Sequence, residues 1–324
     1  MKNTAFCPST LPALQQITSV FDFIWPAYTA LWNLRWQVKG YIDVTKAMGK
    51  KVSPENLRKV FVTKKIHGEN LERLSTTDWA VQENLFSQIL LAYAFSIYEG
   101  WIDDIAEILG WRKEKKNALQ YHKRDKAKDQ DYVIQKIVKN WKKNISDNDK
   151  LIGSLVYDIA KKNKKYAVDS LEYLMICYRC FKEARNAFIH SNGKVTEKLK
   201  QAYDEYKNNI SYIEGIMDEA PVFLPLPNIK EKFELSLRGV VGLYNVIIFL
   251  IVTLDTELSN SQYSEKILIH RMKTEPIKKK KNHNNKSRTL YFFNEHKIPF
   301  DKTKIDSIIE PIIKTQGFVF SDDK

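Results

Sequence analysis

The residues best suited to chemistry lie in one short segment, Glu183 to Gly193, which reads EARNAFIHSNG. Arg185 offers a planar guanidinium fork that fits the oxygens of a phosphate. His190 carries an imidazole, a group that can give or take a proton during phosphodiester cleavage. Asn186 can hold either partner by hydrogen bonds. These residue types predict cleavage of RNA. The 2′-hydroxyl of RNA is itself the nucleophile, so neither a metal nor a covalent enzyme intermediate is required.

The spacing of Arg185 and His190 sets a condition on the helix that carries them. Residues five apart on a regular helix point in different directions, since neighbours on one face lie three or four apart. The two side chains converge only if the helix ends or distorts between them, or if a second protomer completes the site. Asn192-Gly193 favours a nearby helix end, where a protonated imidazole suits a general acid. The alternative interpretation is a surface cation and a capping histidine.

The segment resembles the Arg-Asn-x3-His signature of the HEPN superfamily, as found in bacterial ribonuclease and defence-associated members. The resemblance covers the motif, the His-Ser-Asn-Gly turn after it and the order of helices over residues 80–260. Within FSIYEGWIDDIAEIL, Tyr98-Glu99 matches the position where an acidic residue follows an aromatic one in the first core helix. The N-terminal region, a charged insertion and the C-terminal tail are not matched to the family.

The resemblance implies an all-α, up-and-down helical bundle that forms a homodimer, with two Arg–His pairs in one cleft. It implies a metal-independent endoribonuclease that acts on tRNA or mRNA and leaves a 2′,3′-cyclic phosphate. A toxin or anti-phage effector, with an antitoxin or a defence partner, is the expected role. The alternative is a non-catalytic HEPN-like module that binds nucleotides, RNA or a partner chain. The expected site residues are catalytic Arg185, Asn186 and His190, supporting Glu99 and Asn192, and RNA-binding Lys182 and Lys194.

The composition is that of an ordinary globular protein, and its charge favours a polyanionic partner. The 324 residues are 44% hydrophobic and 28% charged, and they include only 11 Gly and 10 Pro, which favours long helices joined by few loops. Lys and Arg number 52 against 39 Asp and Glu, a net charge of +13. Such a field attracts nucleic acid, or an anionic membrane surface. The 3 cysteines argue against a disulfide framework and for a cytoplasmic protein.

No metal or cofactor site is expected. Cys177 and Cys180 form a CxxC pair, but a structural zinc ion needs about four ligands and no second pair lies nearby in the sequence. The other histidines are scattered in polar surroundings without ligand spacing. We therefore expect the two cysteines to pack within their helix.

Hydrophobic periodicity divides the chain into regions. Residues 1–79 are an aromatic-rich, helical N-terminal region, and residues 80–260 are the bundle. The charged stretch 112–150 is interpreted as a largely solvated insertion within it. Residues 261–288 are interpreted as an exposed basic linker, and residues 289–324 as a small module or an arm that packs on another chain.

Capping residues mark the ends of the expected helices. Ser53, Asp78 and Thr196 are expected to begin helices, and Gly110 to end one. The expected long helices are Asp78–Gly110, Asp169–His190, Thr196 to Met217 and Leu235–Leu258.

One apolar run invites a membrane interpretation. It extends from Val240 to Leu254, which is shorter than the roughly 20 residues that span a bilayer, so a buried bundle helix is favoured. The start of the sequence lacks a continuous apolar stretch, so no secretory signal is expected. A membrane-associated helical protein that uses this run and the basic linker is the third hypothesis.

Overall fold

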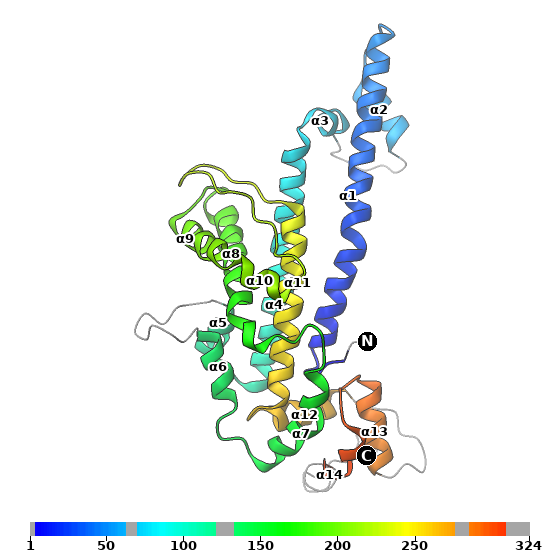
Figure 1. The fold of residues 1–324 in the computed structure, drawn as a ribbon. Helices are drawn as coiled ribbons and strands as arrows, with labels where there is room; N and C mark the ends of the chain where they lie inside the picture. Colours follow the sequence, from blue (N-terminus) through cyan, green and yellow to red (C-terminus); the bar gives the residue numbers. More distant parts are fainter. Residues whose placement is uncertain (1–3, 63–69, 121–132, 276–284, 309–324) are drawn as a thin grey trace.

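The computed structural model describes residues 4–62, 70–120, 133–275 and 285–308. Over these residues the chain is helical, and the bridge between Lys194 and Lys232 is the only β pairing. The all-α bundle expected from the sequence is thus confirmed (Figure 1).

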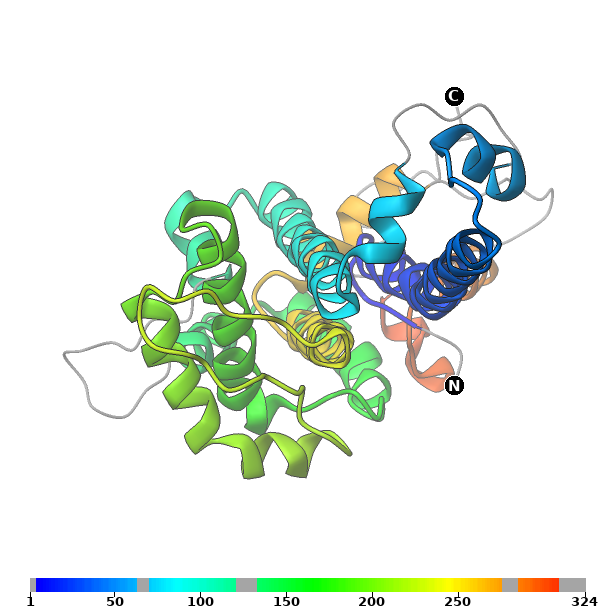
Figure 2. The same ribbon diagram turned by 90° about the horizontal axis from the view of Figure 1, so that it is seen from above.

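Three long helices form the centre of the bundle: α4 (Trp79–Leu109), α8 (Leu171–His190) and α11 (Leu237–Ser259). Each packs on the other two, and α11 is seen end-on between α8 and α1 (Thr10–Ala47) in Figure 2. The hydroxyl of Tyr244 donates to the carbonyl of Leu90, so α11 runs beside α4. A short 3-10 turn, η1 (Val168–Ser170), leads into α8.

Helix α1 belongs to two cores. Ile17 and Ile24 in its first half are fully buried in the main core, against α4 and α11. Its second half extends beyond the bundle (Figure 1) and packs with two short helices around a second, smaller cluster. These helices are α2 (Pro54–Phe61) and α3 (Leu71–Thr76). The N-terminal region is therefore an extension only in its second half.

The predicted caps are present. The side chains of Ser53, Asp78 and Thr196 accept hydrogen bonds from backbone N–H groups of the first turn, and Gly110 ends α4 with a φ of 64°. The helix expected from Thr196 to Met217 is instead divided into α9 (Glu197–Asn208) and α10 (Ile210–Ile216). At the break, the side-chain amide of Asn209 donates from Nδ2 to the backbone carbonyl of Glu205. Such local side-chain bonds compete with the helical hydrogen-bond pattern.

The charged stretch 112–150 packs more closely than expected. Its helices are amphipathic, and Leu119, Ile134 and Trp141 are buried in the main core. A helix around Ile134 and Trp141 was expected, whereas the burial of its apolar face on the bundle was not. Residues 121–132 lie outside the described residues. The helices are α5 (Lys113–Gln120), α6 (Val133–Trp141) and α7 (Asp147–Ala160).

The prediction that residues 261–288 form an exposed linker is wrong over the first part of this range. Residues 264–274 form a helix whose Ile267 and Leu268 are buried in the main core. The tail packs on its own chain, since Phe293 is buried and the N–H of Asp301 donates to Leu155 of α7. The lysine-rich run and residues 309–324 lie outside the described residues. The elements are α12 (Ser264–Thr274), α13 (Asn285–Glu295), η2 (Lys302–Lys304) and α14 (Asp306–Ile308).

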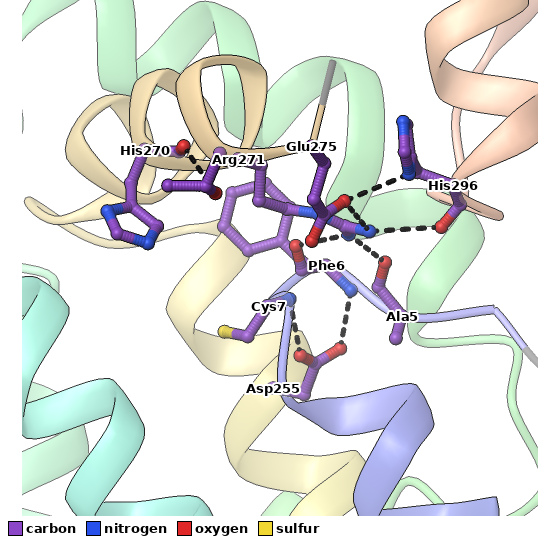
Figure 3. A network of polar contacts seen from close by, with 9 residues as sticks. Ala5, Phe6, Cys7, Asp255, His270, Arg271, Glu275 and His296 are labelled. Carbon is purple, nitrogen blue, oxygen red and sulfur yellow. Dashed lines mark hydrogen bonds and ion pairs between the residues drawn. The ribbon is translucent and has the colours of Figure 1, made fainter. Parts of the chain in front are cut away.

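A buried polar network fixes the N-terminal segment to the end of α11 and to α12 (Figure 3). The carboxylate of Asp255 accepts hydrogen bonds from the N–H groups of Phe6 at 2.8 Å and Cys7 at 2.7 Å. Burial raises the pKa of this carboxyl, against the lowering effect of its donors. The guanidinium of Arg271 donates to the carbonyls of Ala5 and Phe6. The N-terminal segment is therefore part of the core.

Helices α4 and α11 are both long and apolar enough to cross a membrane, by length and composition alone. In α11, 72% of the apolar window is buried within the protein. Its last turns carry buried Asp255 and Glu257, and the Glu257 carboxylate accepts hydrogen bonds from Tyr157 and Tyr166. Buried, partnered carboxylates suit a core helix. The interpretation of residues 240–254 as a bundle helix is confirmed, consistent with a soluble protein.

Candidate functional site

The motif residues lie on the second half of α8, which is uninterrupted from Leu171 to His190. On a regular helix, five residues turn the side-chain direction by about 140° and advance it by about 7.5 Å. Arg185 and His190 therefore point to different sides of α8, while Asn186 and His190 lie one turn apart on one side. The helix neither ends nor distorts between Arg185 and His190, so one chain alone does not bring them together.

The guanidinium of Arg185 is half-buried and only partly satisfied. Its Nη1 donates to Oδ1 of Asn186 at 3.2 Å. Its Nε is buried and has no hydrogen-bond partner among the described residues. An unsatisfied buried donor costs about 1–3 kcal/mol. This donor is closed to solvent, so an incoming oxygen atom can reach it only after the Arg185 side chain moves.

Lys182 lies one helical turn before Arg185 and is buried. Its ammonium donates to Glu99 Oε1 of α4 at 2.8 Å and to the carbonyl of Gln120 at 2.9 Å, and the residue is 3% exposed. Burial lowers the pKa of Lys182, Glu99 opposes this, and the nearby Arg185 lowers it further. The expectation that Lys182 binds RNA is therefore corrected, because its charge is buried and paired. Glu99 contacts this lysine and so supports α8 from α4.

His190 is the last residue of α8 and is exposed to solvent. The turn after it is tightly built, with Asn192 at φ 52° and the N–H of Gly193 donating to the carbonyl of Ala187 at 3.0 Å. A Cβ atom at Gly193 would meet the Phe188 ring at 3.2 Å in a left-handed backbone, so glycine is required there. The structure places Asn192, expected to support the site, as an exposed residue of this turn.

Lys194 lies on the surface beside the end of α8, together with a second lysine that sequence reasoning missed. The bridge of Lys194 to Lys232 brings the two exposed residues side by side. It is fixed by the hydrogen bond from the N–H of Phe233 to the carbonyl of Gly193 at 3.1 Å. No local spacing signals this pairing, because the two lysines are far apart in the sequence. The result is a pair of exposed lysines, of which Lys194 follows His190 closely in the chain.

The cysteine pair in α8 has a packing role. Cys177 and Cys180 are free and fully buried, and burial raises the pKa of both thiols. The packing expected from the sequence is thus confirmed. Among the described residues, no group of three or more His, Cys, Asp or Glu side chains is placed to hold a metal ion.

Comparisons with known proteins give no relative: no family model, no curated protein and no solved structure matches the chain. The resemblance to the HEPN superfamily therefore stays a prediction from the sequence.

Proposed function

We propose that this protein is a metal-independent endoribonuclease that acts as a homodimer, with Arg185, Asn186 and His190 as its catalytic residues. The observation that supports this best is the state of Arg185. Asn186 holds its guanidinium, which keeps one unsatisfied buried donor, on the helix that ends at the exposed His190. When the side chain turns towards solvent, this donor becomes available for the charge that develops on a phosphate oxygen in the transition state.

A homodimer would reconcile the proposed site with the regularity of α8. Because Arg185 and His190 point to different sides of one helix, a composite site takes each from a different copy. Ile189 lies between their directions on the helix and is 53% exposed, so it offers apolar contact area where two such helix ends would meet. A two-fold axis near Ile189 would give two equivalent sites in one cleft.

In this mechanism the RNA supplies its own nucleophile. Its 2′-hydroxyl oxygen attacks the phosphorus and its proton passes to water, while the bond from phosphorus to the 5′-oxygen breaks. The electron pair leaves with the 5′-oxygen, which takes a proton from the His190 imidazolium. Arg185 stabilises the added negative charge on the phosphate, and Lys194 and Lys232 hold neighbouring phosphates. The products are a 2′,3′-cyclic phosphate and a 5′-hydroxyl.

The decisive experiment compares His190→Ala with wild-type protein on total RNA and on tRNA, followed by end-group mapping. Wild-type protein should leave 2′,3′-cyclic phosphate ends in the presence of EDTA, and the variant should lose at least about 100-fold in rate. His270→Ala is the matched control, since His270 is a partly exposed helical histidine on α12. If His190→Ala cleaves as fast as wild type, or if EDTA abolishes cleavage, the proposed chemistry is wrong.

The second candidate is a non-catalytic module that binds RNA, nucleotides or a partner chain. It is favoured by the divergence of Arg185 and His190 within one chain. A protein that stays monomeric with RNA present, and binds RNA without cutting it, would establish this alternative.

The toxin or anti-phage role has its own test: expression of wild-type protein should arrest growth, and expression of His190→Ala should not.

A further inference from the structure

A cavity of about 370 Å³ lies between α1 and α4, far along the chain from the motif on α8. It is lined by Tyr28, Thr29 and Trp32 from α1 and by Trp79 and Glu83 from α4. Three of these five side chains are aromatic and one is a carboxylate, so the lining chemistry is specific enough to ask what would fit.

The Trp79 ring packs nearly perpendicular to both of the other rings. Trp32 and Trp79 have ring centroids 4.8 Å apart at 77°, and Tyr28 and Trp79 have centroids 5.1 Å apart at 72°. The polar atoms of the walls are used in a short chain of hydrogen bonds. Trp79 Nε1 donates to the Tyr28 hydroxyl at 3.1 Å, and that hydroxyl donates to Glu83 Oε2 at 2.9 Å. A ligand can therefore interact with the surfaces of the aromatic rings and with the negative charge of the Glu83 carboxylate.

The carboxylate of Glu83 has no cationic partner in the described part of the chain, where its hydrogen bond comes from Tyr28. Two positive groups further along α1 have other partners. Arg35 donates to the carbonyl of Thr77 at 3.1 Å, and Lys39 lies over the Trp36 ring at 5.0 Å. In a protein with a net charge of +13, an unpaired carboxylate beside three aromatic rings is a place where a cation is stabilised by charge and by ring quadrupoles.

We propose that an organic cation of the alkylammonium class binds at the open side of this aromatic cavity, against the rings of Tyr28, Trp32 and Trp79, with Glu83 neutralising its charge. A nucleobase fits the same observations less well. A base stacks flat on a ring, whereas the Trp79 ring is nearly perpendicular to the other two, and the Glu83 carboxylate repels the phosphate of a nucleotide. The proposal is independent of the nuclease function, so the His190→Ala protein should bind the same ligands.

The test is isothermal titration calorimetry of the full-length protein with choline and with its neutral isostere, 3,3-dimethylbutan-1-ol. Choline should bind saturably and at least about tenfold more tightly than the isostere, because cation–π and charge attraction are absent in the latter. A peptide with one trimethyl-lysine, compared with the same peptide unmethylated, distinguishes a protein-borne cation from a free one. Adenosine monophosphate is included as the nucleotide probe.

Two substitutions in the aromatic cavity and one outside it complete the test. Glu83→Gln and Trp32→Leu should each weaken the binding of the better cation by about tenfold. Phe23→Leu should leave it unchanged, since Phe23 is exposed on the same helix and does not line the cavity. Thermal melting of each variant verifies its fold. Equal binding of choline and its isostere, full binding by Glu83→Gln, or preferential binding of adenosine monophosphate would each overturn the proposal.

Discussion

Lys182 of α8 and Glu99 of α4 form an ion pair of 2.8 Å one helical turn before Arg185. The lysine side chain is 4% exposed and the glutamate side chain 28% exposed, so the two partners are not equivalent. Loss of the glutamate charge leaves a buried ammonium without its counter-charge, whereas loss of the lysine leaves a carboxylate that water can reach. The pair holds α8 against α4 at the point where the motif begins.

The first prediction follows from this asymmetry. Glu99→Gln should lower the free energy of unfolding by about 1–3 kcal/mol, and Lys182→Met should lower it by less, because methionine keeps the apolar stem and removes the buried charge. Urea unfolding of both variants measures the difference. If Lys182→Met leaves stability intact but removes RNA binding, then the role assigned here to this lysine is incorrect.

The second prediction concerns the composite site. Arg185→Ala and His190→Ala proteins should each be inactive alone. When they are unfolded together and refolded at equal concentration, activity should return to about a quarter of wild type, since half of the dimers are mixed and each holds one intact site. RNA cleavage assays before and after mixing give the result. Two inactive proteins that stay inactive when mixed would count against a site shared between chains.

The third prediction is a pH dependence centred on His296. Its Nδ1 lies 3.0 Å from Glu275, its Nε2 is buried without a partner, and Arg271 binds the same Glu275 carboxylate. Burial lowers the pKa of His296, and Arg271 lowers it further, while Glu275 and Glu295 oppose this.

The unfolded chain therefore takes up the proton more readily than the folded one. The contribution of His296 to the free energy of unfolding should be fully present above the ordinary histidine pKa of about 6.5. This contribution should fall as the pH drops below that value. Urea unfolding at pH 7.5 and at pH 5.5 measures the loss, and His296→Gln should show a smaller loss than wild type. An equal loss in both proteins would exclude His296 as its source.

The fourth prediction compares two helical glycines. A Cβ atom at Gly239 of α11 would lie 1.9 Å from the carbonyl oxygen of Val222, where the segment after Pro221 crosses the helix. Gly239→Ala should therefore cost about 1–3 kcal/mol of stability. Gly40→Ala in α1 has nothing within 4 Å of the added atom, so it should stabilise by about 0.5–1 kcal/mol. Thermal melting gives the sign of both effects, and a neutral Gly239→Ala would contradict the close crossing.

The features of the fold that could be predicted from the sequence are those set by neighbours in the chain. Asp78 and Gly110 bound α4 because their own side-chain chemistry and backbone freedom act within a few residues. Helix α12 was missed because its apolar residues stand among charged ones, and Ile267, Leu268 and Met272 are buried only by contact with distant helices. Arg271 looked like a surface residue, yet three distant carbonyl groups surround its guanidinium.

The same division holds at the candidate site. The segment around Arg185 and His190, and the turn at Gly193, could be located because the motif and its stop signal are local. The burial of Lys182 could not, since it depends on Glu99 and Gln120, which the fold brings from other elements. Lys232 was missed for the same reason. Whether a charged side chain is a surface contact or a buried support is decided by tertiary packing.

The docking of the first residues has a consequence for the order of events during synthesis. Phe6 and Cys7 find their partners on Asp255 and Arg271, about 250 positions later, and such distant contacts form late. While the ribosome is still producing the chain, the Phe6 side chain stays exposed to solvent and accessible to chaperones. This part of the core is completed only when Asp255 and Arg271 have been made.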